Sequence, residues 1–129
     1  MKYMLDTDIA SYLVKKLPRV VERANASLGE WCVSSIVYQE LMMGLLSTKS
    51  QVMELGYERF LRGVEVVEFG QGAAMAAAEL HNHNRSVGHN MGERDNQIAG
   101  HAAFLGLTLV TNNLKHFRAI SGLHVETWV

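Results

Sequence analysis

The sequence predicts an α/β domain in which a mostly parallel sheet is covered by helices on both faces. Short apolar runs that end in polar or acidic residues alternate along the chain with longer segments in which apolar residues recur at helical spacing. A chain of 129 residues, 48% of them hydrophobic, has the size of one ordinary domain and can bury a core. Because no repeat, linker or low-complexity segment interrupts it, we expect a single domain over residues 1–129.

The first half of the chain predicts three strands and four helices. The strands are apolar or alternating runs at residues 2–5, 31–35 and 64–69. The helices keep helical spacing of apolar residues over residues 9–16, 18–27, 36–46 and 51–63. Asp8 is expected to cap the first helix, and Pro18 suits the first turn of the second. Either Ser34 or Ser35 could cap the third.

The second half of the chain continues the alternation. An alanine-rich segment over residues 70–82 should be helical, and a polar, glycine-punctuated stretch over residues 84–94 should be a loop. The remaining elements are a helix, a buried strand, a short helix and a closing strand, over residues 95–106, 107–111, 114–120 and 123–129. Strands that alternate with helices indicate βα units around a parallel sheet.

The composition excludes several classes of protein. A net charge of −1 gives no electrostatic footprint for a nucleic acid, so a polyanion would have to bind at local patches. A single cysteine, Cys32, excludes an internal disulfide and favours a reducing compartment, and we expect the cytoplasm. The apolar run near the N-terminus is too short for a signal peptide or a membrane span, so we expect no membrane contact.

Basic side chains gather in three stretches of the sequence, each of which taken alone fits a solvated helix face better than a binding site. These are Lys15, Lys16, Arg19 and Arg23 early in the chain, Arg59 and Arg62 in the middle, and Lys115, His116 and Arg118 near the end.

Three carboxylates from separate segments are candidates for a metal site. Asp6 directly follows the first strand, Glu40 lies on the helix after the second strand, and Asp95 opens the helix over residues 95–106 on its inward face. In a parallel sheet, ligands bind beyond the carboxyl ends of the strands, where loops and helix starts converge. Taken alone, Glu40 fits a solvated glutamate and Asp95 fits a helix cap equally well. Gly44, one turn beyond Glu40, leaves a gap where another group could approach.

Crowding of these acids carries the prediction of a metal. Carboxylates packed together repel one another and take up protons unless a cation neutralises them. A set of oxygen ligands without histidine or cysteine selects a hard ion, so we expect Mg²⁺ or Mn²⁺. Zinc at His81, His83 and His89 is disfavoured, because residues two apart on a helix point to different sides and no cysteine lies nearby.

With these residues assembled, four segments make the sequence similar to a known family. In chain order they are YMLDTDIASYL, VSSIVYQELMMG, ERDNQIAGHAAFLGLTLVTNNLKHF and ISGLHVETWV, and they span nearly the whole chain. The sequence resembles a PIN-domain ribonuclease, and specifically a VapC-type toxin of a bacterial type II toxin–antitoxin pair.

The resemblance implies an α/β/α sandwich whose acidic pocket holds Mg²⁺ and cuts RNA phosphodiesters, with Asp6, Glu40 and Asp95 as its three acids. It further implies a structured RNA substrate such as transfer RNA, a homodimer, and a partner antitoxin. In that family the tail of the antitoxin covers the site of the toxin, and the antitoxin is the component that binds DNA.

Two positions depart from the family pattern. Many PIN domains carry a fourth acid after the strand that ends LVT, where this chain has Asn112 and Asn113, so one bound metal ion is as plausible as two. The first motif often has asparagine where this chain has Asp8, which either restores some charge or caps the first helix. We favour the cap.

These residues suggest metal-assisted hydrolysis. Asp6 and Asp95 would fix the ion, and Glu40 would complete its ligands or orient the attacking water. Substrate-binding candidates follow the LVT strand: Asn112 and Asn113 for the outer sphere of the metal or a phosphate oxygen, and Lys115 and Arg118 for flanking phosphates.

Two other functions stay open on the sequence alone. The LDTD segment is also compatible with the Asp-x-Asp of a phosphatase of the haloacid dehalogenase type, although the acids that such an enzyme needs after a later strand are replaced here by NNLK. The acidic pocket would equally serve a non-catalytic binding module that holds a metal for structure or recruits a partner.

Overall fold

A five-stranded parallel sheet forms the centre of the protein in the computed structural model, which describes all residues 1–129. The strands are β1 (Tyr3–Leu5), β2 (Trp31–Ser34), β3 (Val66–Val67), β4 (Thr108–Val110) and β5 (Val125–Glu126). Their order across the sheet is β3-β2-β1-β4-β5, and every neighbouring pair is parallel. The predicted parallel sheet is therefore confirmed.

Seven helices connect the strands. They are α1 (Thr7–Val14), α2 (Pro18–Ala26), α3 (Ser35–Ser47), α4 (Gln51–Gly63), α5 (Gln71–Ser86), α6 (Glu93–Leu105) and α7 (Leu114–Arg118). No helix in the chain combines the length and the apolar character needed to cross a membrane.

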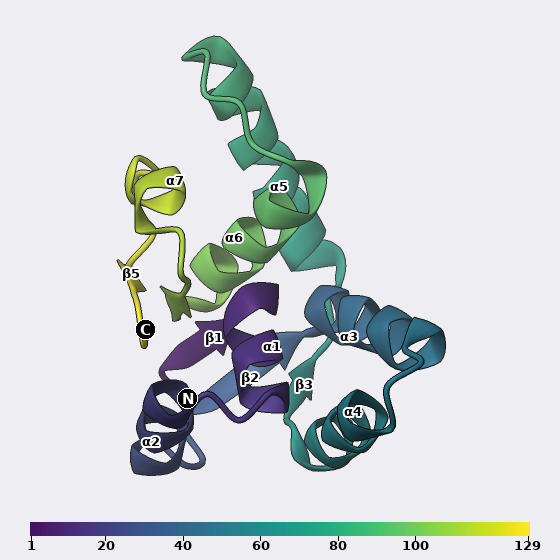
Figure 1. Cartoon of the computed structure of the whole chain (residues 1–129). Helices are drawn as coiled ribbons and strands as arrows, with labels where there is room; N and C mark the ends of the chain where they lie inside the picture. The colour runs from purple at the N-terminus through teal and green to yellow at the C-terminus, as the bar shows by residue number, and fades with distance from the viewer.

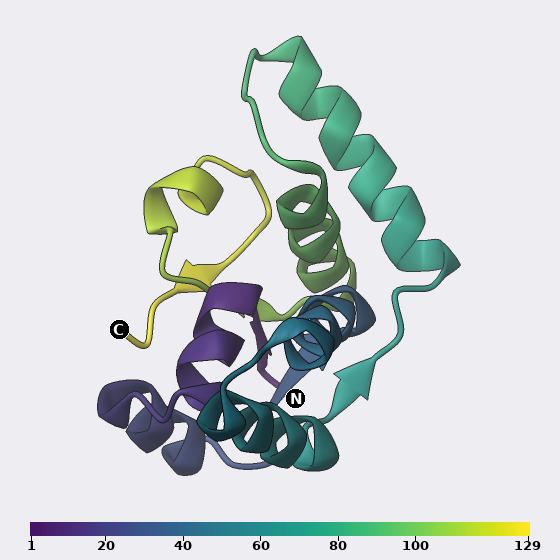
Figure 2. The same cartoon turned by 45° about the vertical axis from the view of Figure 1, so that its right-hand side comes forward.

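The direction of the chain across the sheet reverses between β1 and β4. The connections through α1 to α4 lead from β1 outward to β3, whereas α5, α6 and α7 lead to β4 and β5 on the other side of β1. Because crossovers between parallel strands are right-handed, this reversal places the two sets of helices on opposite faces. Figures 1 and 2 show α1 and α4 on one face of the sheet and α6 on the other, which confirms the three-layer α/β/α sandwich.

The core lies on both faces of the three central strands. Met4, Leu5, Val33 and Leu109 are fully buried. They pack with apolar residues of α1, α3 and α6 and with aromatic residues from the end of the chain, among them Trp128. This core fixes the carboxyl ends of β1 and β4 side by side, which is where a sheet of this topology binds ligands.

Helix α5 is longer than the sequence predicts. It continues to Ser86, so residues 84–86 are helical rather than part of a loop. The reason is Asn84, which is buried and donates to the side-chain oxygen of Asn96 at 3.4 Å, while Asn96 donates to the Ala77 carbonyl at 2.8 Å. This pairing of polar groups between α5 and α6 cannot be recognised in a sequence that otherwise has loop composition. Figure 1 shows the end of α5 projecting beyond the rest of the molecule.

The edge strands differ from prediction in the other direction. Residues 64–69 and 123–129 were expected to be strands, but β3 and β5 contain only two residues each. Both lie at the edges of the sheet, where each can pair with one neighbour only. The helix starts are close to those predicted, and Ser34 rather than Ser35 caps α3, with its hydroxyl accepting from the Ile36 N–H at 3.1 Å.

Close packing of α5 on α6 yields a test of this fold. A Cβ added to Gly100 would lie 2.7 Å from Ala77 Cα, so Gly100→Ala should push two backbones apart and lower the free energy of unfolding by about 1–3 kcal/mol. Gly63→Ala is the matched control, because a Cβ at this helical position meets nothing within 4 Å. Urea denaturation followed by circular dichroism measures both changes, and equal midpoints for the two variants would contradict the packing.

Candidate active site

Asp6 stands at the junction of β1 and α1. Its backbone N–H donates to the Val110 carbonyl of β4 at 3.0 Å, and its Oδ1 accepts the Ile9 N–H at 3.0 Å. Asp6 is therefore the N-cap of α1, and the whole residue is only 6% exposed. The prediction that Asp8 caps this helix is wrong, because β1 ends at Leu5 and the helix already begins at Thr7, which leaves Asp6 as the residue between them. Asp8 lies exposed in the first turn.

Burial dominates the electrostatics of Asp6. It raises the pKa of the Asp6 carboxyl from its ordinary value of 3.8 to about 6. The charges of Asp8 and Asp95 add to this rise, while hydrogen bonds from the Ile9 N–H and the Thr111 hydroxyl partly oppose it. Asp6 is thus a carboxylate that is costly to ionise in this site without a cation.

Glu40 reaches the same edge of the sheet from α3. Its Oε1 accepts the Thr7 hydroxyl at 2.6 Å, and its Oε2 accepts from an Arg94 guanidinium nitrogen at 3.2 Å. The side chain is only 20% exposed, so it is not a free solvated glutamate. The gap expected at Gly44 is filled by Tyr57, whose hydroxyl would lie 2.5 Å from an added Cβ.

A buried histidine holds α3 in register with α6. The Ser34 hydroxyl that caps α3 lies 2.9 Å from Nδ1 of His101, which is 1% exposed on α6. Burial lowers the pKa of His101 and keeps the ring neutral, and the Ser34 hydroxyl, whose oxygen already accepts from Ile36, can donate its hydrogen to Nδ1. This contact fixes the helix that carries Glu40 against the helix that carries Asp95.

Asp95 lies in the first turn of α6. The N-cap of this helix is Gly92, so Asp95 is not a cap. The sequence predicts that the helix begins at Asp95, whereas it begins two residues earlier, at Glu93. Burial raises the pKa of the Asp95 carboxyl, the His116 ring opposes that rise, and the charges of Glu40 and Asp8 add to it. His116 Nε2 lies 3.5 Å from an Asp95 oxygen, and the Asp95 side chain is 48% exposed.

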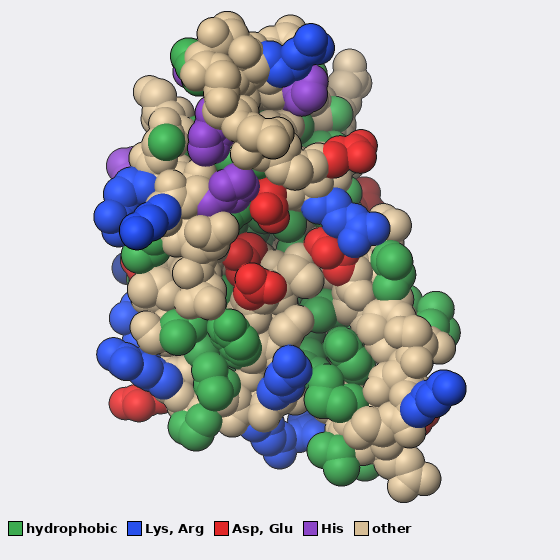
Figure 3. Space-filling view, turned by 45° about the horizontal axis from the view of Figure 1, so that its top comes forward, with side chains coloured by type: hydrophobic (Ala, Val, Ile, Leu, Met, Phe, Trp, Pro, Cys, Tyr) green, Lys and Arg blue, Asp and Glu red, His purple; other side chains and the backbone are tan.

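The structure brings acids from three segments to the same edge of the sheet. At the carboxyl end of β1, the charge of Asp95 acts on Asp6, the charge of Glu40 acts on Asp95, and the charge of Asp8 acts on both. All three aspartates of the chain belong to this set. Figure 3 shows acidic side chains gathered on one face, with basic side chains and histidines beside them.

The residues after β4 line the neighbouring edge. Thr111 is fully buried and accepts the Asn113 N–H at 3.0 Å, while the Asn112 amide donates to the Tyr12 hydroxyl at 3.2 Å. The structure thus brings Asn112 and Asn113 to the right end of the sheet, without directing Asn112 at the acids. The other two substrate-binding candidates, Lys115 and Arg118, are exposed on α7.

Sequence reasoning missed the roles of Thr7, Arg94 and His116 as partners of the acids. Thr7 and Arg94 are each adjacent in the chain to a predicted acid, which was the available signal. His116 had none, because its contact with Asp95 depends on how α7 folds back toward α6. Of the other histidines, His81 and His83 are exposed on α5, and His89 packs against His116 with ring centroids 5.5 Å apart.

The donor set has the chemistry of a site for a hard cation. As the side chains stand, no three histidine, cysteine, aspartate or glutamate residues have the spacing to hold a metal ion. Glu40 and Asp95 are instead held by Arg94 and His116, whose contacts lie at the rim of the site. Rotation of these two acids toward Asp6 would supply oxygen ligands only, and a divalent ion would stabilise the ionised form of Asp6, whose pKa is raised chiefly by burial and further by the charges of Asp8 and Asp95.

Comparison with protein families and known sequences gives a consistent result. The model of the family described as the PIN domain matches residues 3–123. The tRNA(fMet)-specific endonuclease VapC of Shigella flexneri is 36% identical over 132 residues, covering 99% of this chain and 98% of that protein. Ribonuclease VapC2 of Haemophilus influenzae is 36% identical over 133 residues, covering 100% of this chain and 99% of that protein.

Solved structures agree over the whole chain. The structure of DNA-bound VapBC from Salmonella typhimurium superposes with a TM-score of 0.90 at 34% identity, covering 100% of this chain and 99% of that chain. The structure of VapBC2 from Rickettsia felis bound to a DNA fragment from their promoter gives a TM-score of 0.91 at 32% identity and covers both chains fully.

The raised pKa of Asp6 predicts a pH dependence of stability. Asp6 binds a proton more tightly in the folded protein than in the unfolded chain, so its contribution to the free energy of unfolding falls as the pH rises from 3.8 to about 6. The fall amounts to at most about 3 kcal/mol. Urea denaturation at pH 4 and pH 7 without metal should show this dependence in the native chain and much less of it in Asp6→Asn. Identical pH dependence in both would remove the claim, and Glu54→Gln, an exposed acid of α4, serves as the control.

Proposed function

Because this chain belongs to the PIN-domain family, and within it to the VapC ribonucleases, we propose that it is the endoribonuclease toxin of a toxin–antitoxin pair. The observation that carries the proposal is the convergence of Asp6, Glu40 and Asp95 where the strand order reverses between β1 and β4. The phosphatase alternative lacks support, since Asn112 and Asn113 stand where its later acids would be.

A divalent ion fits this site. Ribonucleases of the PIN-domain family generally depend on a divalent metal ion, and we propose Mg²⁺, with Mn²⁺ as a possible substitute. Such an ion supplies Lewis-acid activation of a phosphate and of a water molecule. Asp6 and Asp95 would hold it. Glu40, whose Oε1 accepts the Thr7 hydroxyl at 2.6 Å, would either complete the ligands of the ion through Oε2 or orient the attacking water as a base.

The substrate is proposed to be a structured RNA of the transfer RNA class, in view of the relative named tRNA(fMet)-specific endonuclease. With a net charge of −1, the chain must bind phosphates through local groups. Lys115 and Arg118 lie on α7, directly after β4, and would contact phosphates that flank the cut, while Asn112 and Asn113 would contact phosphate oxygens or metal-bound water.

This chain offers a surface for the proposed antitoxin on the face of the sheet that carries α1. A groove of about 590 Å³ is lined by apolar residues of α1, α2 and α4, including Leu13, Val21 and Phe60, together with Lys16 and Arg59. An apolar floor with basic residues at its edge fits an amphipathic, acidic segment of a partner. The groove begins at the end of α1 opposite Asp6, and a helix of 8 residues is about 12 Å long, so a segment that continues along α1 would reach the acids.

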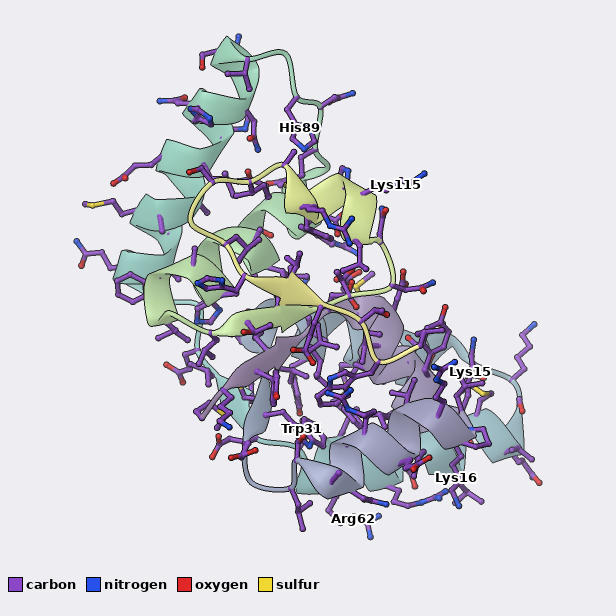
Figure 4. The ribbon with its side chains drawn as sticks, turned by 90° about the vertical axis from the view of Figure 1, so that its left-hand side faces the viewer. Lys15, Lys16, Trp31, Arg62, His89 and Lys115 are labelled. Atoms are coloured by element: carbon purple, nitrogen blue, oxygen red, sulfur yellow. The ribbon has the colours of Figure 1, made fainter.

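Figure 4 shows this side of the molecule, with Lys15, Lys16, Trp31 and Arg62 around α2 and with Lys115 and His89 at the other end.

The similar Salmonella and Rickettsia structures are of VapBC complexes bound to DNA. For this chain we propose that DNA is reached only through the antitoxin. A homodimer and a cytoplasmic location complete the proposal, with the free, buried Cys32 supporting the latter.

Removal of one acid tests the nuclease. Asp6→Asn and Asp95→Asn should each reduce cleavage of transfer RNA by at least about a hundredfold, because each removes a charge that holds the ion. Glu54→Gln, an exposed acid on α4, is the control and should cleave normally. Mapping of new RNA ends in cells that express each variant measures the effect, and full activity in either aspartate variant would contradict the mechanism.

Metal removal distinguishes the nuclease from a non-catalytic binding module. The module remains an alternative because Asn112 and Asn113 stand after β4 where many PIN domains carry a fourth acid. A chelator should abolish cleavage by the purified protein, and added Mg²⁺ or Mn²⁺ should restore it. If no RNA is cut at any Mg²⁺ concentration, the binding module is favoured instead.

A substitution in the groove tests the partner surface. Val21→Glu places a charge among the apolar lining residues, so it should weaken inhibition by the antitoxin at least tenfold while RNA cleavage persists. The matched control is Val52→Glu on α4, which is 79% exposed and does not line the groove. Co-expression and growth assays measure inhibition. Unchanged inhibition of Val21→Glu would place the antitoxin elsewhere.

A further inference from the structure

Arg94 occupies a position that the stability of its own helix does not explain. It is the second residue of α6, directly before Asp95. A positive charge in the first turn of a helix faces the positive end of the helix dipole, which is unfavourable. The compensating interaction is with another helix, because the Arg94 guanidinium donates to Oε2 of Glu40 at 3.2 Å.

The two partners of Glu40 are not equivalent. Thr7 is half-buried and fixed in the first turn of α1, and its hydroxyl donates to Oε1 at 2.6 Å. Arg94 has a long side chain that is 52% exposed, and its bond to Oε2 is longer. An ion pair of this exposure is weak because water screens it, so Oε2 is the oxygen that Glu40 can release.

The position of Arg94 also suits a second partner. A guanidinium has five N–H donors in a planar fork that matches the oxygens of a phosphate, and it remains charged at any physiological pH. When Glu40 turns toward a cation held by its neighbours Asp6 and Asp95, the guanidinium loses its carboxylate at the rim of the acidic site. It is then unpaired next to the place where a phosphodiester would be cut.

We propose that Arg94 exchanges partners during the reaction, from the Glu40 carboxylate in the metal-free protein to a phosphate of the bound RNA. This inference rests on the proposed function for its second half only. In the metal-free state Arg94 competes with a cation for Glu40. In the loaded state it positions the substrate, so the same residue opposes metal binding and favours RNA binding.

Binding of Mn²⁺ without RNA tests the first half. Loss of an exposed ion pair of this kind should tighten Mn²⁺ binding by Arg94→Gln about two- to fivefold. Removing any nearby positive charge also favours a cation, so the measurement is repeated in the Glu40→Gln background. There the gain should disappear, because the exchange acts through Glu40. Electron paramagnetic resonance of free Mn²⁺ measures each dissociation constant.

RNA cleavage at saturating Mn²⁺ tests the second half. Arg94→Gln should raise KM for transfer RNA about tenfold with a smaller change in kcat, and should lower the salt dependence of RNA binding by about one phosphate contact. Arg94→Lys should recover part of the loss, since it keeps the charge without the fork. The matched control is Arg19→Gln, because Arg19 is exposed at the second position of α2 and should change neither KM nor Mn²⁺ binding.

The outcomes separate this inference from the proposed function. The exchange is wrong if Arg94→Gln binds Mn²⁺ no more tightly than the native chain, or if Mn²⁺ affinity rises equally in the native and Glu40→Gln backgrounds. This holds whatever the KM for transfer RNA is. If Mn²⁺ binding changes as expected but KM does not, Arg94 is a competitor for Glu40 alone and its role toward RNA is wrong. If the native chain cuts no RNA, the proposed function fails, and the Mn²⁺ measurement still decides whether Arg94 and a cation compete.

Discussion

Burial of the Asp6 carboxylate at the end of β1 is the constraint on which the site depends. The same side chain ends a central strand, caps α1 and lies beside the end of β4, so it cannot move away from its acidic neighbours without disturbing the fold. Its charge is therefore expensive, and its pKa rises to about 6. Glu40 and Asp95 lie at the edge of the same site and are more exposed. Glu40 forms an ion pair with Arg94, and Asp95 contacts the ring of His116.

The sheet acts as a device for bringing distant acids together. Asp6 comes from the first strand, Glu40 from the helix after the second, and Asp95 from the helix before the fourth, and only their position in the topology makes them neighbours. Packing then sets the fine geometry, through the Ser34–His101 contact between α3 and α6 and the close approach of Gly100 to Ala77. Destabilising these apolar and capping contacts would spread the acids and weaken the site without altering any acid.

The alternation of apolar runs and helical patterns predicted the element order and the parallel sheet, because strands and helices each impose their own period on the sequence. Asp6 and Asp95 could be proposed from the sequence because strand ends and helix starts are visible in it, whereas Arg94 and His116 contact the acids only through packing between elements far apart. The extension of α5 was missed for a similar reason, since Asn84 has loop character until Asn96 satisfies it. The assignment of the helix cap to Asp8 failed by two residues, which is enough to exchange a buried carboxylate for an exposed one.

Arg94 pairs with Glu40 and His116 contacts Asp95 at the rim of the acidic site, and we propose that a divalent ion replaces these partners. The most direct measurement follows the chemical shift of the Asp6 side-chain carboxyl carbon by nuclear magnetic resonance as the pH is varied, with and without Mg²⁺. Asp6 should titrate with a pKa of about 6 in the absence of metal, and saturating Mg²⁺ should lower that pKa sharply. An Asp6 carboxyl that titrates near its ordinary value of 3.8 and does not respond to Mg²⁺ would contradict the account.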